Sequence, residues 1–220
     1  MSDASHRLEA VRAGIARSAA LARRRPEEVT LVAVSKTQPA EAIRPLIEAG
    51  QRVFGENRVQ ESQAKWPALK EEAPDVRLHL IGRLQSNKAE DAVTLFDAIH
   101  SVDRPSLVDS LAAAMEKAGR RPECFIQVNI GEEPQKGGCA PADLPDLLAA
   151  AQAAGLPLAG LMAIPPLEIE PAPYFALLAK LARRHGLGGL SIGMSADYET
   201  AVTIGATHVR VGTALFGARS

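Results

Sequence analysis

Apolar residues recur along the first part of the chain at the spacing of an amphipathic helix. Within residues 5–22 they occupy Leu8, Val11, Ile15, Ala19 and Ala22. Positions three or four residues apart lie on one face of a helix, so this segment predicts a helix with one apolar face.

After that helix, the pattern changes to short apolar runs of strand length. They lie at residues 30–35, 51–54, 76–81, 96–102, 124–130, 157–163, 189–193 and 208–211. Stretches rich in alanine and leucine separate many of them, most clearly at 104–118, 141–154 and 172–185. Strands that alternate with helices are typical of parallel β/α units.

Eight such strands would close a (β/α)8 barrel, and a chain of 220 residues lies near the lower length limit of that fold. We therefore predict one α/β domain over residues 1–220, a (β/α)8 TIM barrel with an extra N-terminal helix. An open doubly wound sheet is the alternative. The helix between the second and third strands is the least clear, because Trp66-Pro67 is expected to break it.

Composition and charge narrow the functional classes. Hydrophobic residues make up 46% of the chain, and the formal net charge of −1 gives no support for nucleic-acid binding. The basic run Arg23-Arg24-Arg25 is interpreted as the end of a helix. The N-terminus lacks the apolar core of a signal peptide and no apolar run could span a membrane, so we expect a cytoplasmic protein without membrane contact.

Polar residues gather directly after the predicted strands, where a barrel of this type places its functional site. Lys36 comes immediately after the apolar run 30–35. A lysine in this position is either a surface residue or an amine that can form an imine with an aldehyde.

The last two predicted strands are followed by groups that suit an anion. Ser195 opens a predicted helix, of which it would be the N-cap, and Gly212-Thr213 follows the final strand. Such groups can hold a phosphate, although each also fits a structural role. Together with Lys36 they suggest an aldehyde that carries a phosphate, and pyridoxal 5′-phosphate (PLP) is the obvious candidate.

Arg210 lies inside the apolar run His208-Val209-Arg210-Val211 and needs a partner if it is buried. That partner is either a carboxylate such as Asp197 or Glu199, or an acceptor on a ring. An arginine facing the pyridine nitrogen of PLP would leave that nitrogen unprotonated and weaken the ring as an electron sink.

Metal and nucleotide chemistry find no support in the sequence. The histidines and the two cysteines show no metal-ligand spacing, and His79 and His100 are expected to be satisfied core residues. A Ser-His-Asp signature, a GxGxxG fingerprint and a P-loop are all absent from the sequence.

Several segments, taken in order, carry a resemblance to a known family. They are Leu31-Val32-Ala33-Val34-Ser35-Lys36-Thr37, Phe54-Gly55-Glu56-Asn57, residues 79–88 (HLIGRLQSNK), residues 160–165 (GLMAIP), Ser191-Ile192-Gly193-Met194-Ser195 and residues 209–219 (VRVGTALFGAR). From about the first helix to the C-terminus, the chain resembles the pyridoxal phosphate homeostasis proteins, the YggS/PROSC group. That family has a single barrel like the N-terminal domain of alanine racemase.

The resemblance implies a role for each candidate residue. Lys36 would carry PLP as a Schiff base, Arg210 would face the pyridine nitrogen, and Asn57 would line the pocket. The phosphate would be held by Ser195, Gly212 and Thr213. Gln38 occupies the position where many relatives have a second lysine, whereas a lysine in the loop after the fifth strand has a counterpart in Lys136.

The resemblance also implies a protein that binds PLP without efficient catalysis and helps to balance its free level. Racemisation needs a base on each face of the substrate carbon, and the tyrosine domain of alanine racemase has no counterpart in this sequence. We therefore expect a monomer whose partners are PLP and PLP-dependent apoenzymes. The alternatives are a small PLP-dependent enzyme, such as an amino-acid racemase, and an aldolase that uses a Schiff-base lysine.

Overall fold

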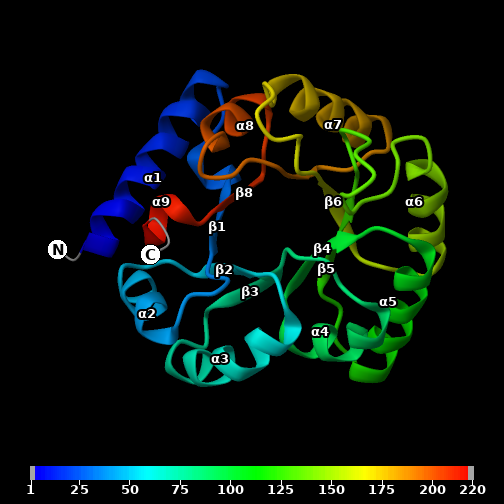
Figure 1. Cartoon of the computed structure of the whole chain (residues 1–220), viewed down its shortest axis with the longest axis horizontal. Helices are drawn as coiled ribbons and strands as arrows, with labels where there is room; N and C mark the ends of the chain where they lie inside the picture. The colour runs from blue at the N-terminus through cyan, green and yellow to red at the C-terminus, as the bar shows by residue number, and fades with distance from the viewer. Residues whose placement is uncertain (1–2, 218–220) are drawn as a thin grey trace.

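The computed structural model describes residues 3–217, and the strands within that range form one closed parallel barrel (Figure 1). In chain order around the barrel they are β1 (Thr30–Val34), β2 (Val53–Glu56), β3 (Arg77–Leu80), β4 (Ala98–Val102), β5 (Glu123–Gln127), β6 (Leu158–Met162), β7 (Gly189–Ser191) and β8 (His208–Val211). The (β/α)8 barrel that the alternating pattern predicts is confirmed, and the open doubly wound sheet is excluded.

Helices surround the barrel on its outside (Figure 1). They are α1 (Asp3–Leu21), α2 (Ala40–Glu48), α3 (Val59–Glu72), α4 (Ala89–Leu95), α5 (Pro105–Ala118), α6 (Leu144–Ala153), α7 (Ala172–Arg184), α8 (Tyr198–Ile204) and α9 (Thr213–Phe216), with short 3₁₀ turns at η1 (Pro26–Glu28) and η2 (Ser86–Lys88). The additional helix α1 packs against α8 and α9, as its apolar face requires.

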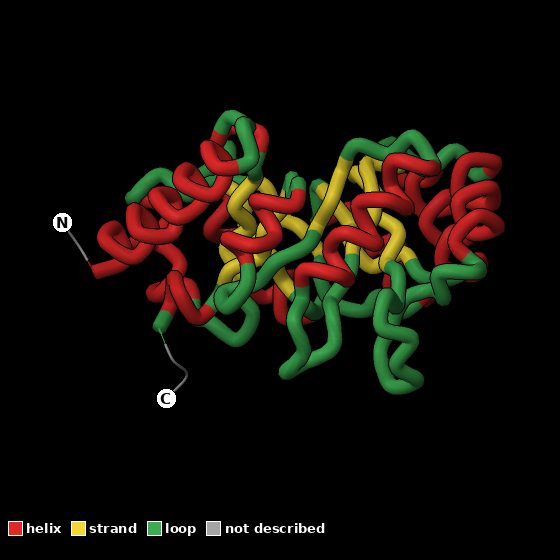
Figure 2. Tube along the Cα trace, turned by 90° about the horizontal axis from the view of Figure 1, so that it is seen from above, coloured by secondary structure: helices red, strands yellow, loops and turns green. Residues whose placement is uncertain are grey.

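The barrel closes where β1 pairs with β8. Val32 lies opposite Arg210 and Ala33 lies opposite Val211 in this register. The loops that follow the two strands, which begin at Ser35 and Gly212, are therefore neighbours. The longer loops of the molecule project from one end of the barrel (Figure 2).

The barrel interior contains a cluster of rings from strands that are not all adjacent. His79 on β3, His100 on β4, Phe125 on β5 and His208 on β8 contact one another, with ring centroids between 4.3 and 5.9 Å apart. Side chains from these strands can meet only inside the barrel. His79 and His100 are buried, so their expected place in the core is confirmed.

The expectation that Trp66-Pro67 breaks a helix is wrong. Helix α3 runs from Val59 to Glu72 and contains Pro67. Trp66 is fully buried, its ring lies 5.2 Å from that of Phe54, and its Nε1 donates to Glu56 Oε1 at 3.0 Å. These contacts offset the backbone hydrogen bond that a proline removes from a helix interior.

One smaller expectation also needs correction, and another is confirmed. The second strand begins at Val53 instead of 51, because the backbone N–H of Gln51 still closes α2 by donating to the carbonyl of Leu46 at 2.9 Å. The buried side-chain amide of Gln51 donates to the carbonyls of Leu31 and Val53, each at 2.7 Å. The basic run at 23–25 closes α1 as expected, because Arg23 has a φ of +55° and the backbone N–H of Arg24 donates to the carbonyl of Ala19 at 2.9 Å. The side chain of Arg24 also donates to the carbonyls of Val202 and Ala206 at the end of α8, where a cation complements the helix dipole.

Across residues 3–217, no helix combines the length and the apolar character that a membrane crossing needs.

Candidate functional site

Lys36 lies at the end of β1, on the wall of a small cavity. The cavity measures about 40 Å³, and its lining includes Lys36 and Thr37 from one loop and Gly212 and Thr213 from the other. The Lys36 amine forms no hydrogen bond or ion pair with the described residues. The structure thus brings together an unpartnered amine and two of the three residues expected to hold a phosphate.

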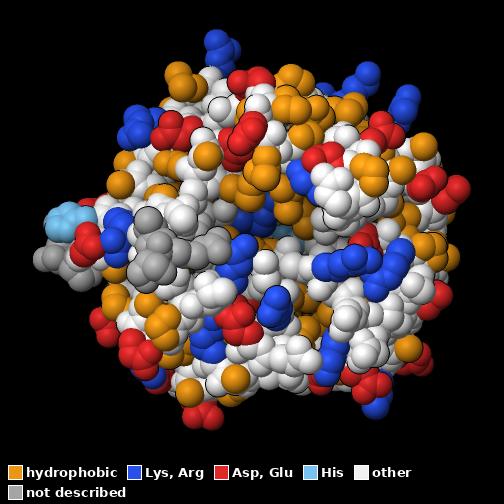
Figure 3. Space-filling view, in the orientation of Figure 1, with side chains coloured by type: hydrophobic (Ala, Val, Ile, Leu, Met, Phe, Trp, Pro, Cys, Tyr) orange, Lys and Arg blue, Asp and Glu red, His pale blue; other side chains and the backbone are white. Residues whose placement is uncertain are grey.

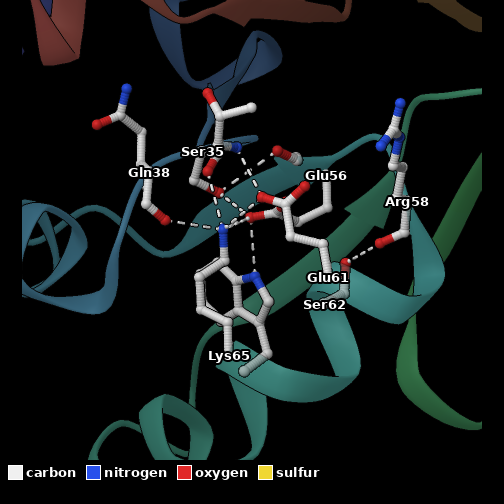
Figure 4. A network of polar contacts seen from close by, with 10 residues as sticks. Ser35, Gln38, Glu56, Arg58, Glu61, Ser62 and Lys65 are labelled. Carbon is white, nitrogen blue, oxygen red and sulfur yellow. Dashed lines mark hydrogen bonds and ion pairs between the residues drawn. The ribbon is translucent and has the colours of Figure 1, made fainter.

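The loop that carries Lys36 is fixed by a second lysine, Lys65 on α3 (Figure 4). Its Nζ donates to the carbonyl of Ser35 at 2.9 Å and to that of Gln38 at 3.0 Å. The ammonium therefore binds the backbone on both sides of Lys36. Lys65 itself is 9% exposed and pairs with the fully buried Glu56 at 2.8 Å.

Glu56 and Glu61 extend this network to the rest of the loop (Figure 4). Glu56 Oε1 accepts from the Ser35 hydroxyl at 2.7 Å, and Glu61 Oε1 accepts from the backbone N–H of Thr37 at 2.6 Å. Thr37 has a φ of +63°, which is rare for a β-branched residue. The hydrogen bond that Thr37 donates to Glu61 holds Thr37 in this conformation and so fixes the backbone next to Lys36.

Ser195 lies beside the end of β8, but it is not the helix N-cap that the sequence suggests. Helix α8 begins at Tyr198, and the side chain of Asp197 accepts from the backbone N–H of Met194 at 2.6 Å. The Ser195 hydroxyl oxygen instead accepts from the N–H groups of Gly212 at 3.1 Å and Ala214 at 3.5 Å. Ser195 therefore joins the loop after β7 to the loop after β8.

Arg210 is 4% exposed and forms no ion pair with a carboxylate of residues 3–217, so the Asp197 or Glu199 pairing considered from the sequence is wrong. One guanidinium nitrogen donates to both the carbonyl and the hydroxyl oxygen of Ser191 at 2.6 Å, and the other donates to the carbonyl of Ala163 at 3.0 Å. Burial lowers the pKa of Arg210 to about 10, which still leaves it cationic at neutral pH.

A buried hydrogen-bond chain runs from Arg210 into the barrel. Because Ser191 Oγ accepts from Arg210, its proton is free to donate to His100 Nδ1 at 2.8 Å. His100 then carries its proton on Nε2 and donates to His79 Nδ1 at 3.1 Å. The hydrogen bonding thus assigns one neutral tautomer to each ring. Burial, supported by the nearby cations, lowers the pKa of His79 to about 3.

The remaining predicted residues lie at other positions around the same end. Asn57 lines a larger cleft beside Arg58 and Arg83 and does not line the 40 Å³ cavity of Lys36. Lys136 donates to the carbonyl of Pro165 at 2.9 Å and pairs with Glu133. In Figure 3, Lys and Arg side chains gather around the central hollow of this face.

The sequence reasoning missed Lys65 and Ser191. Lys65 occupies a helix that looked broken at Pro67, and Ser191 is one small residue in an apolar strand. The spacing of Glu61 and Lys65 could have indicated Lys65, because an acidic and a basic residue four positions apart share one helix face.

Metal and thiol chemistry find no support at this site. Within residues 3–217, no group of three or more histidine, cysteine or acidic side chains is arranged to hold a metal ion. Cys124 and Cys139 are buried, and burial raises the pKa of each thiol to about 12. Both therefore remain protonated at neutral pH.

Comparison with known proteins supports the resemblance read from the motifs. Residues 6–220 match the family model for the N-terminal domain of alanine racemase. The pyridoxal phosphate homeostasis protein of Escherichia coli strain K12 is 42% identical over 229 residues, covering 100% of this chain and 98% of the relative. The chain belongs to the family of pyridoxal phosphate homeostasis proteins. Its relative in Pseudomonas aeruginosa strain PAO1 is 44% identical over 226 residues, covering 100% of this chain and 97% of that one.

Solved structures extend the family relation to three dimensions. PipY of Synechococcus elongatus, solved with PLP bound, aligns with a TM-score of 0.84 and 41% identity over 98% of this chain and 100% of PipY. Alanine racemase from Streptomyces lavendulae aligns with a TM-score of 0.68 and 23% identity, covering 96% of this chain and 58% of the racemase. This second likeness concerns the fold alone.

Proposed function

We propose that this member of the pyridoxal phosphate homeostasis family binds PLP as a Schiff base on Lys36 and acts in cytoplasmic PLP homeostasis without efficient catalysis. One observation carries the proposal. The unpartnered amine of Lys36 shares a cavity with Gly212 and Thr213, and the buried cation of Arg210 lies on the neighbouring strand.

The donor set of the site fits the chemical groups of PLP. Lys36 supplies the amine that an aldehyde requires. Gly212, Thr213 and Ser195 supply backbone and hydroxyl groups of the kind that hold a phosphate. Arg210 supplies a buried guanidinium that donates to Ser191 and Ala163 and forms no ion pair with residues 3–217, and a pyridine nitrogen would give it a further acceptor. Asn57 is proposed to contribute from the neighbouring loop.

The properties of Arg210 support a protein that holds PLP and does not turn over amino acids. PLP supplies an aldehyde for covalent attachment and a ring that can accept electrons. A pKa of about 10 keeps the proton on the guanidinium at neutral pH. A ring nitrogen facing Arg210 would accept a hydrogen bond but no proton, which limits the ring as an electron sink.

The cellular role follows from the relatives. Proteins 42% and 44% identical over essentially their full length carry the name pyridoxal phosphate homeostasis protein, and PipY was solved with PLP bound. We extend this role to the present chain, with PLP-dependent apoenzymes as the partners that receive PLP and a monomer as the working form.

Absorption spectroscopy of the purified protein, followed by an activity assay, tests the proposal. We expect the visible absorbance of bound PLP and no sustained racemisation or decarboxylation of L- or D-alanine. Turnover in the usual enzyme range of about 1–1,000 per second would overturn the non-catalytic part and favour the racemase alternative. Failure to acquire PLP absorbance on incubation with PLP would overturn the binding part.

A further inference from the structure

A second concave site opens at the ends of β2, β3 and β4, beside the loop that carries Lys36. It is a cleft of about 720 Å³, a size typical of sites for small metabolites. Four cations line it: Arg58 after β2, Arg83 and Lys88 after β3, and Arg104 after β4. We call it the basic cleft and define it by these four residues.

The charge of the basic cleft is not balanced by its own lining. No acidic residue contributes to the lining, although the chain as a whole has a net charge of −1. Arg58 and Arg83 are exposed, and neither guanidinium forms a hydrogen bond or ion pair with residues 3–217. In Figure 4, the Arg58 side chain extends away from the network of Glu56 and Lys65. These two cations are therefore available to a ligand.

The other two cations give the cleft a defined shape. Arg104 donates to the carbonyl of Leu84 at 2.9 Å and to the Ser86 hydroxyl at 3.2 Å, and it pairs with Asp103. It thus fixes the loop that carries Arg83. Lys88 pairs with Asp91 at 3.4 Å, at the start of α4.

A glycine also brings the two walls of the cleft together. A Cβ at Gly82 would lie 2.3 Å from the backbone oxygen of Asn57, so only glycine permits this approach without a shift. The loop after β3 is consequently packed against the loop after β2. Arg83 and Arg58 each directly follow one of these contact residues, so the approach sets where the two free cations emerge.

The lining chemistry selects a multiply charged anion. Cations and neutral polar groups, including Asn57, Gln85 and Asn87, dominate the cleft. Arginine binds phosphate oxygens through paired donors, and several cations around one concave surface favour a group with two or more negative charges. We propose that the basic cleft binds a small molecule that carries a phosphate or diphosphate group, separately from the site formed by Ser195, Gly212 and Thr213.

Calorimetric titration with inorganic pyrophosphate, at a fixed ionic strength, tests the proposal on the full chain. The test variant is Arg58→Gln with Arg83→Gln, which removes two charges without removing any structural contact described above. The matched control is Arg183→Gln with Arg184→Gln, two exposed arginines in the last turn of α7. A third protein, Ser195→Ala with Thr213→Ala, reports on the other anion site.

We expect saturable binding of pyrophosphate to the unmodified protein. The test variant should bind at least about fivefold more weakly than the control, because two cations that touch the anion are lost. Ser195→Ala with Thr213→Ala should bind as tightly as the unmodified protein. The proposal is overturned by absent or non-saturable binding, by a smaller difference between test and control variants, or by loss of binding in the Ser195 and Thr213 variant.

Discussion

At the scale of single residues, the site combines groups whose chemistry is visible in the sequence with contacts that are not. Lys36, Ser195, Gly212 and Thr213 were identifiable because each follows a predicted strand. That Ser195 accepts hydrogen bonds from Gly212 and Ala214 could not be predicted, because this contact joins the loops after β7 and β8 and depends on how those two strands pair. The structure therefore gives Ser195 a role in orienting the backbone of the neighbouring loop.

Replacement of Ser195 and Thr213 by alanine should weaken the binding of PLP much more than the binding of pyridoxal, which lacks the phosphate. Hydrogen bonds to a charged group contribute roughly 1.5–3 kcal/mol each, and every 1.4 kcal/mol is about tenfold in affinity. We therefore expect PLP to bind at least about tenfold more weakly, with pyridoxal nearly unchanged. Absorbance titrations of both ligands against both proteins measure the difference. An equal loss of affinity for the two ligands would mean that these residues support the loops and do not bind the phosphate.

At the scale of elements, helix α3 supports the end of β1. The sequence predicted the strand well, since β1 ends at Val34 and the apolar run ends at Ser35. It did not predict that α3 contacts the loop after β1. Pro67 argued against a continuous helix there, and no local pattern shows that a lysine is buried. Glu56 and Lys65 meet only after β2 and α3 have packed together.

Lys65→Met should destabilise the protein, because it leaves the fully buried carboxylate of Glu56 without its cation. Breaking a buried pair by removing one partner costs about 3–5 kcal/mol. Urea unfolding measures this change, and Lys65→Met should also slow or weaken formation of the PLP absorbance. The matched control is Lys117→Met, whose pair with Glu90 is 70% and 65% exposed, and which should change stability by less than about 1 kcal/mol. Similar losses in the two variants would contradict the role assigned to Lys65.

At the scale of the whole molecule, the barrel was predictable because eight apolar runs and their spacing are a property of the entire chain. The interior was less predictable. The sequence indicates that His79 and His100 are buried, but the ring cluster with His208 depends on strand order and register. The pairing of β7 with β8 brings Arg210 to Ser191, and Arg210 forms no ion pair with a carboxylate of residues 3–217.

The buried histidines should make stability depend on pH. Burial lowers the pKa of His79 to about 3 and that of His208 to about 4. An unfolded histidine takes up a proton near pH 6.5, so between these values the unfolded state binds more protons. The free energy of unfolding should therefore fall as the pH decreases from about 6.5 towards 4, by on the order of a few kcal/mol.

Urea unfolding at pH 7.5 and pH 4.5 measures this fall. In His79→Asn the side-chain oxygen can still accept from His100, while the group that titrates is gone. The fall between the two pH values should be smaller in this variant. An equal fall in both proteins would show that His79 does not titrate in the way its burial implies.

The central claim, that Lys36 carries PLP, is tested most directly by borohydride reduction of the PLP-loaded protein followed by peptide mass spectrometry. Reduction fixes a Schiff base as a stable amine on the lysine that formed it. We expect the mass of the adduct on the peptide that contains Lys36, and no adduct at that position in Lys36→Ala. An adduct found only on another lysine, such as Lys65 or Lys136, or no adduct at all, would contradict the account.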